Sequence, residues 1–409
     1  MPLPQFYCVQ QNFKREAVED IAGNVRQQFL QFDFENKIQK GQSVAIAVGS
    51  RGISHLYSLV TAVIGVLKSL KLEPFIVPAM GSHGNATADG QVQVLKKMKI
   101  AEESMGVSII SDMAVVSLGR LDVGAEIFFS KDAIEADHVV PINRVKPHTA
   151  FRGEVESGLC KMLAVGLGKQ KGASTLHKYG LSQVLIPSAL RILEKVSVLF
   201  GVAVVENPFD QIHTIQLVRP ESFIDVDRQL LKLAWEMFPK IPLENLDILI
   251  VDEMGKNISG AGMDPNVVGL WRREGGKRNP DYRIILVLDL TDESHGNAVG
   301  IGLADLTTQH VMKKIDMETT HMNALTSGVL RSVCLPIPLK NDRIALETAL
   351  NLLPNPSQVK MARITNTLKV QKFWVTDNCL SQLNSREGVI LDDKPVEIEF
   401  DNSGRIKPI

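Results

Sequence analysis

The sequence predicts an α/β fold with two domains, each containing a mostly parallel sheet flanked by helices. Apolar β-branched runs alternate with stretches of helical periodicity along most of the chain, the order typical of βαβ units. The chain has 409 residues, more than one hydrophobic core usually supports. A proline-bounded stretch at 237–247 interrupts the alternation, which then restarts. We therefore expect an N-terminal domain at 1–240 and a C-terminal domain at 241–409.

The first half reads as repeated strand, turn and helix. Apolar spacing predicts a helix over 14–33, and the β-branched run at 43–53 predicts a strand that ends in the turn GSRG before a helix at 56–70. The pattern repeats over 71–98, where a strand leads to the turn GSHGN and to a helix whose start is marked by Thr87. Further strands are expected at 107–112, 126–130, 138–146 and 201–207, the last after a helix that begins near 181.

The second half repeats the alternation. Strands are expected at 246–254 and 282–290, helices near 303–316 and 341–353, and a final strand and turn at 396–409. A glycine-rich loop at 255–275 separates the first two strands, and loops of this length in compact domains are usually functional or disordered.

Composition and charge favour a small-molecule role. With Lys+Arg 45 against Asp+Glu 46, the chain has no long-range field to attract nucleic acid or an anionic membrane. Its four cysteines lack metal-knuckle spacing, and its apolar runs are too short to cross a bilayer. We expect free thiols, no secretory signal and a cytoplasmic protein, with the oligomeric state open.

The stretch from 144 to 179 contains several residues that can bind a metal, carry a proton or bond to a cofactor. It sets out His148, Lys161 and His177 among five glycines. Histidine supplies a neutral metal ligand or a proton carrier, a lysine amine can bond covalently to a cofactor, and glycine lets backbone approach a ligand. His83 lies in GSHGN and Arg51 in GSRG. Ligands of open parallel sheets bind at such strand ends.

Familiar motifs are absent, and three functions remain open on the residues alone. The chain has no GxGxxG fingerprint, Walker A sequence, GxSxG elbow or HExxH motif. The stretch at 144–179 fits a cofactor-dependent enzyme. A zinc hydrolase could instead use His83, His148 and His177 as its three ligands. A non-enzymatic regulatory protein could bind a nucleotide through the glycine-rich turns.

Four motifs together resemble the lactate racemase family, which uses a nickel pincer nucleotide (a pyridinium-3-thioamide-5-thiocarboxylic acid mononucleotide with nickel). They are GSHGN, KPH, SGLCKML and STLH, in order along the chain. The resemblance implies that His83 and His148 are the acid/base pair, that Lys161 is the covalent tether, and that His177 coordinates nickel. It also implies cofactor contacts by Gly81, Ser82, Asp264 and Asn266.

The same resemblance implies an isomerase that would racemise or epimerise a 2-hydroxy acid by reversible hydride transfer from C2 to the cofactor. Its implied partners are the small-molecule substrate and the proteins that make the cofactor. A base on each face of C2 suits the chemistry, because the hydroxyl proton leaves as the hydride does. We expect these groups to meet in a cofactor cleft between the domains, closed by the loop at 255–275.

Substrate binding is where the sequence departs from lactate racemase. Arg51 occupies the position of the family's carboxylate-binding arginine, but Val48 replaces the aspartate before it. In the second domain, Gly269 and Arg272 stand where lactate racemase has glutamine and lysine. We expect Arg272 to bind substrate and Gly269 to open space, which favours a 2-hydroxy acid bulkier than lactate.

Overall fold

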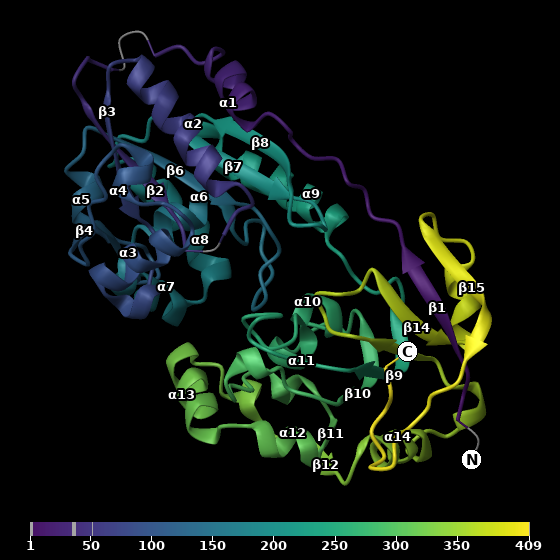
Figure 1. Cartoon of the computed structure of the whole chain (residues 1–409). Coiled ribbons are helices and arrows are strands. Elements are labelled where there is room, and N and C mark those ends of the chain that lie inside the picture. The colour runs from purple at the N-terminus through teal and green to yellow at the C-terminus, as the bar shows by residue number, and fades with distance from the viewer. Residues whose placement is uncertain (1–2, 35–37, 51, 409) are drawn as a thin grey trace. The chain divides into compact units, whose positions relative to one another are not determined.

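The structure is a computed structural model, and it describes residues 3–34, 38–50 and 52–408. The chain divides into two compact units (Figure 1). One unit runs from Lys14 to Phe238, and the other combines the segment up to Phe13 with Pro239–Ile409. None of the helices in the described part of the chain is long and apolar enough to cross a membrane.

The N-terminal unit (Lys14–Phe238) is built on a five-stranded sheet in the order β3-β2-β6-β7-β8. All neighbours are parallel except β7 and β8, and a separate hairpin joins β4 to β5. The strands are β2 (Ser43–Val48), β3 (Glu73–Pro78), β4 (Val115–Arg120), β5 (Glu126–Ser130), β6 (His138–Arg144), β7 (Gly201–Glu206) and β8 (Ile212–Val218).

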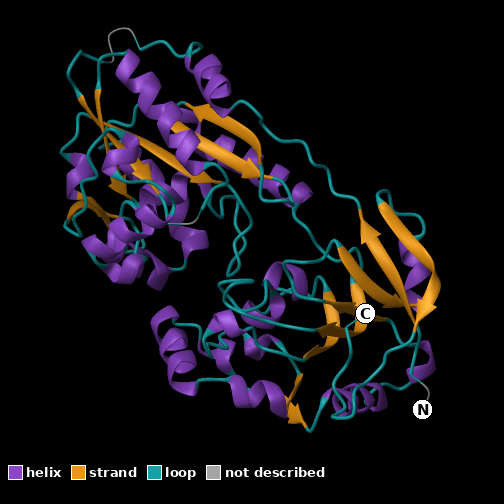
Figure 2. Ribbon diagram, viewed as in Figure 1, coloured by secondary structure: helices purple, strands orange, loops and turns teal. Residues whose placement is uncertain are grey.

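Helices cover both faces of this sheet (Figure 2). Along β2, Val44, Ile46 and Val48 face one apolar cluster, and Ala45 and Ala47 face the other. This alternation buries the strand on both sides, which explains its continuous apolar sequence. The main helices are α1 (Ile21–Phe29), α2 (Leu56–Ser69), α3 (Ala88–Lys97), α6 (Gly158–Lys161), α7 (Lys169–Tyr179), α8 (Leu181–Leu193) and α9 (Phe223–Met237), with short turns α4 (Glu102–Met105) and α5 (Lys131–Ile134).

The C-terminal unit contains an eight-stranded mixed sheet in the order β12-β11-β10-β9-β13-β14-β1-β15. The first five are parallel, and β14, β1 and β15 continue the sheet antiparallel. The strands are β1 (Phe6–Gln11), β9 (Asn245–Val251), β10 (Asp281–Val287), β11 (Leu306–Thr308), β12 (Ile337–Leu339), β13 (Met361–Ile364), β14 (Lys372–Thr376) and β15 (Val389–Val396). Its helices are α10 (Pro265–Val268), α11 (Trp271–Glu274), α12 (Gln309–Lys314), α13 (Met317–Ser327), α14 (Asp342–Asn351) and α15 (Leu380–Leu383).

The predicted α/β fold class is confirmed, and several details of the elements differ. β1 pairs with β14 and β15, so the first residues belong with the C-terminal unit and not with a domain at 1–240. The strand expected at 107–112 is reduced to one bridge between Ile76 and Ile109. The helix expected at 14–33 begins only at Ile21, because the side chain of Asp20 caps it by accepting from the Gly23 amide.

In the last part of the chain, the expected helices near 303–316 and 341–353 shorten to α12 and α14. The final strand, β15, ends at Val396, where the sequence led us to expect it to begin. As far as Pro408, the segment after it contains one bridge, between Phe400 and Ile406.

Candidate active site

The turn that carries His83 leaves the carboxyl end of β3, beside the turn that leaves β2. Val48 and Pro78, at the ends of these two strands, are register partners. Past them, the Ser50 hydroxyl contacts His83 Nδ1. Arg51, the predicted substrate-binding residue, lies outside the described residues, so its role stays a prediction.

Gly81 joins the His83 turn to the segment 144–179, which carries His148, Lys161 and His177. Its amide donates to the Gly166 carbonyl at 3.1 Å, and its φ of +59° is one that glycine adopts without strain. A Cβ at this position would lie 3.3 Å from the Ala173 Cβ, so the approach is close. On the other side, the Gln91 amide donates to the Gly81 carbonyl at 2.9 Å. Ser82, between the glycine and the histidine, is exposed.

His148 lies in a loop that folds around the buried carboxyl of Glu156. Glu156 is 1% exposed, and it accepts hydrogen bonds from the His148 amide at 2.7 Å and from the Gly153 amide at 3.3 Å. The His148 ring packs on Phe151 with 4.5 Å between ring centroids, and its Nδ1 accepts from the Ala150 amide at 3.1 Å. These contacts fix both the backbone and the ring of His148.

Lys161 ends the short helix α6, whose amino end is held by a buried carboxyl from α9. Asp227 is fully buried and accepts from the Leu159 amide at 3.0 Å and from the Cys160 amide at 2.8 Å. Gly158 precedes them with a φ of +82°, and a Cβ there would lie 2.2 Å from the Asp227 carboxylate. The glycine of SGLCK is therefore required by the carboxylate that caps the lysine's helix.

Lys161 and His177 lie close enough for their charges to interact. A π-helical turn from Met162 to Gly166 follows α6, and the chain then enters α7, which carries His177 near its end. The surrounding protein desolvates the His177 imidazole and lowers its pKa, and the positive charge of Lys161 lowers this pKa further. The lowered pKa favours the neutral ring, which is the form that binds a metal ion.

Glu156, which binds the His148 amide, also interacts electrostatically with Lys161. Burial raises the pKa of its carboxyl, and this is opposed by the hydrogen bond from the His148 amide and by the charges of Arg152 and Lys161. Lys161 is thus coupled to His177 on one side and to the Glu156 loop on the other. Ser50, Glu156 and Asp227 are contacts that the sequence patterns did not predict. Glu156 was open to prediction as an acid eight residues after His148, whereas Asp227 reaches α6 from a distant helix.

The predicted residues of the second half lie in the C-terminal unit. Asp264 caps α10 by accepting from the Asn266 amide at 2.8 Å, and its own amide donates to the Thr367 hydroxyl at 2.9 Å. Asn266 is buried, with 7% exposure. Their cofactor contacts stay a prediction, while the structure gives Asp264 a clear local role in forming the loop.

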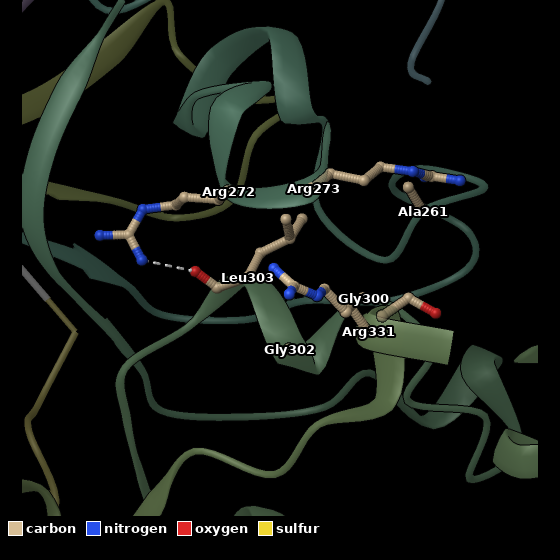
Figure 3. Close-up of a pocket in the computed structure, with 8 residues that line it drawn as sticks. Ala261, Arg272, Arg273, Gly300, Gly302, Leu303 and Arg331 are labelled. Atoms are coloured by element: carbon tan, nitrogen blue, oxygen red, sulfur yellow. Dashed lines mark hydrogen bonds between the residues drawn. The ribbon is translucent and has the colours of Figure 1, made fainter. Parts of the chain in front are cut away.

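Arg272 makes its contacts inside the C-terminal unit, beside a small pocket that it helps to line (Figure 3). Its guanidinium donates to the Leu303 carbonyl at 3.0 Å and to the Tyr282 carbonyl, and it pairs with Asp305 at 2.8 Å. The side chain is only 6% exposed. These contacts favour a structural role over the predicted binding of a substrate carboxylate.

Gly269 does not open space in the way the sequence suggested. It has a φ of +109°, and a Cβ there would lie 2.7 Å from the Trp271 indole nitrogen and 3.0 Å from the Pro280 carbonyl oxygen. The indole therefore fills the position, and the glycine is explained by its backbone conformation. The expectation of a bulkier substrate loses this support.

Within the described residues, no three His, Cys, Asp or Glu side chains gather closely enough to hold a metal ion. His83, His148 and His177 therefore do not form a three-ligand zinc cluster in the structure. The arrangement instead provides one imidazole beside one amine, with two further histidines in the turns that follow β3 and β6.

Comparison with known proteins agrees with the motifs. Residues 9–183 match the family model of the lactate racemase N-terminal domain. Among solved structures, the lactate racemase apoprotein from Thermoanaerobacterium thermosaccharolyticum is similar over 89% of this chain and 99% of that one. Its TM-score is 0.57 at 14% sequence identity, which shows a shared fold. No curated protein matches the sequence. Residues 9–183 therefore resemble the lactate racemase N-terminal domain, and the chain shares the fold of the lactate racemase apoprotein.

Proposed function

We propose that this protein is a racemase or epimerase of a 2-hydroxy acid that works with a nickel pincer nucleotide attached to Lys161. The observation that carries the proposal is the placement of Lys161 beside His177, whose pKa is lowered, in the segment against which the His83 turn packs. The family match and the shared fold support the same class of enzyme.

The residues present fit the cofactor. The Lys161 amine would hold it covalently, and the His177 ring, whose pKa is lowered, would supply a nitrogen ligand to nickel. Close backbone packing at Gly81 and Gly166 gives the lysine and the histidine a fixed setting. The cofactor, when bound, supplies the acceptor for the hydride that leaves C2.

The histidines would handle the hydroxyl proton. As C2 loses a hydride, the substrate hydroxyl must lose a proton, and a positioned imidazole can accept it and later return it. His83 and His148 lie on separate turns of the N-terminal unit, each fixed by its own hydrogen bonds. Two such rings would let proton transfer serve both enantiomers or epimers.

Mass spectrometry of the protein co-expressed with the cofactor-making proteins tests this proposal. We expect added mass on the peptide that contains Lys161, bound nickel, and racemisation of a 2-hydroxy acid. Lys161→Ala should remove the adduct, whereas Lys178→Ala, a change to an exposed lysine on α7, should keep it. An adduct that persists in Lys161→Ala, or no adduct in the co-expressed wild type, would contradict the proposal.

A further inference from the structure

The two candidate proton-transfer histidines have different partners at the same ring nitrogen. In His83 the Nδ1 atom contacts a serine hydroxyl, and in His148 it accepts from a backbone amide. A neutral imidazole carries its proton on one nitrogen only, and a partner that can only donate, or only accept, decides which one. The two rings are therefore not equivalent before substrate binds.

The partner of His148 is a donor under all conditions. The Ala150 amide can only donate, and its distance of 3.1 Å to Nδ1 makes that nitrogen an acceptor. A neutral His148 then carries its proton on Nε2 and offers an N–H group at that atom. Adding a proton at Nδ1 would place two donors face to face, so His148 must break this contact before Nδ1 can be protonated, as its turn as the base on the opposite face requires.

The partner of His83 can accept. A serine hydroxyl both donates and accepts, so Ser50 can receive a hydrogen bond from a protonated Nδ1. In that arrangement Nε2 carries the lone pair, which is the state a base needs. When Nε2 then takes the proton of a substrate hydroxyl, the imidazolium keeps its Nδ1–H bond to Ser50. One orientation of the hydroxyl therefore serves both charge states.

We propose that Ser50 is a positioning residue that keeps neutral His83 protonated on Nδ1, so that His83 begins turnover as the base while His148 presents Nε2–H. The part of this inference that concerns turnover rests on the proposed function, whereas the two tautomers are properties of the protein by itself. Ser50 can act on its neighbour because β2 and β3 are paired in register and release both turns at one edge of the sheet.

Histidine NMR of the cofactor-free protein measures the tautomers directly. With ¹⁵N,¹³C-labelled histidine above pH 8, the ring ¹⁵N and ¹³Cδ2 shifts separate the two neutral forms, and His83→Gln and His148→Gln assign the signals. We expect the Nδ1–H form for His83 and the Nε2–H form for His148. Ser50→Ala should move the His83 ratio toward Nε2–H by a factor of roughly 2–12, the worth of one net hydrogen bond. Ser50→Thr should restore the wild-type ratio, and Ser82→Ala, which removes the adjacent hydroxyl, should leave it unchanged.

Two results would overturn the inference: an Nε2–H form of His83 in the wild type, which needs no variant to detect, or an unchanged ratio in folded Ser50→Ala. Racemisation by the cofactor-loaded enzyme is scored separately. If no 2-hydroxy acid is turned over while the tautomers are as expected, the proposed function fails and the role of Ser50 in setting the ring stands.

Discussion

Removing the carboxyl of Asp227 should strongly destabilise the N-terminal unit, because two buried backbone amides lose their hydrogen-bond acceptor. The side chain is fully buried, and its two oxygens accept from the Leu159 and Cys160 amides at 3.0 and 2.8 Å. In Asp227→Ala both amides lose their partner in a place that water does not reach. The helix that presents Lys161 would then lose its amino-terminal cap.

The size of the effect follows from these two contacts. Each buried donor left without a partner costs about 1–3 kcal/mol, so the variant should lose about 2–6 kcal/mol. For a unit of this size, each kcal/mol lowers the melting temperature by roughly 2–4 °C, which gives a decrease of about 4–24 °C. Thermal unfolding followed by circular dichroism or calorimetry measures it.

Asp225→Ala is the matched control on the same helix. Its carboxylate is 72% exposed and pairs with Arg228 at the surface, so the change should stay within about 0.5 kcal/mol of wild type. A melting temperature for Asp227→Ala equal to that of Asp225→Ala would refute the conclusion that Asp227 holds α6 in place.

Three further predictions concern the packing of Gly158 on Asp227, the titration of Asp227, and the buried Arg272 of the C-terminal unit. Gly158→Ala should destabilise the protein more than Gly41→Ala. Both glycines have a positive φ, of +82° and +85°, but a Cβ at Gly158 would meet the Asp227 carboxylate, whereas one at Gly41 would meet nothing within 4 Å. Equal unfolding free energies of the two variants would show that the steric contact is unimportant. Burial raises the pKa of Asp227 from 3.8 to about 7. The folded protein therefore holds this proton at pH values where the unfolded chain has already released it, which stabilises the fold at low pH. This contribution to the unfolding free energy should be lost as pH rises from about 4 to about 7. Urea unfolding across this range should show a shallower pH dependence in Asp227→Asn, and an unchanged slope would contradict the assignment. Arg272→Ala should lower the unfolding free energy by about 1–3 kcal/mol while Arg278→Ala, whose side chain is 64% exposed, changes it little; retained stability in Arg272→Ala would return that arginine to the candidates for substrate binding.

The fold class was open to prediction because strands buried on both faces leave continuous β-branched runs in the sequence. The strand at 201–207 is one example, found as β7, and the run at 43–53, which contains β2, is another. The membership of β1 was not predictable, because its pairing with β14 and β15 joins residues from opposite ends of the chain. The helix expected at 14–33 was too long because periodicity continues past the point where Asp20 caps it.

Residue type is what makes His148 and Lys161 candidates in the sequence, and their roles stay a prediction. The groups that fix these residues were not predictable, because Asp227 and Ser50 are ordinary in sequence and act through contacts that only the fold creates. Gly269 shows the opposite error. Its lack of a side chain suggested open space, but its positive φ and the nearby Trp271 indole explain why a glycine stands at this position.

Turnover in heavy water tests the proposed chemistry most directly. If a base removed the hydrogen of C2 as a proton, that hydrogen would exchange with solvent, and inversion would place deuterium at C2. A hydride held in a site shielded from water returns to the opposite face of the same molecule. For the cofactor-loaded enzyme and its 2-hydroxy acid, we predict inversion at C2 with little deuterium gained there, and a loss of rate on the order of 10²–10⁴ in His83→Ala and in His148→Ala. Extensive deuterium at C2 during inversion would contradict hydride transfer, even with nickel bound and Lys161 modified.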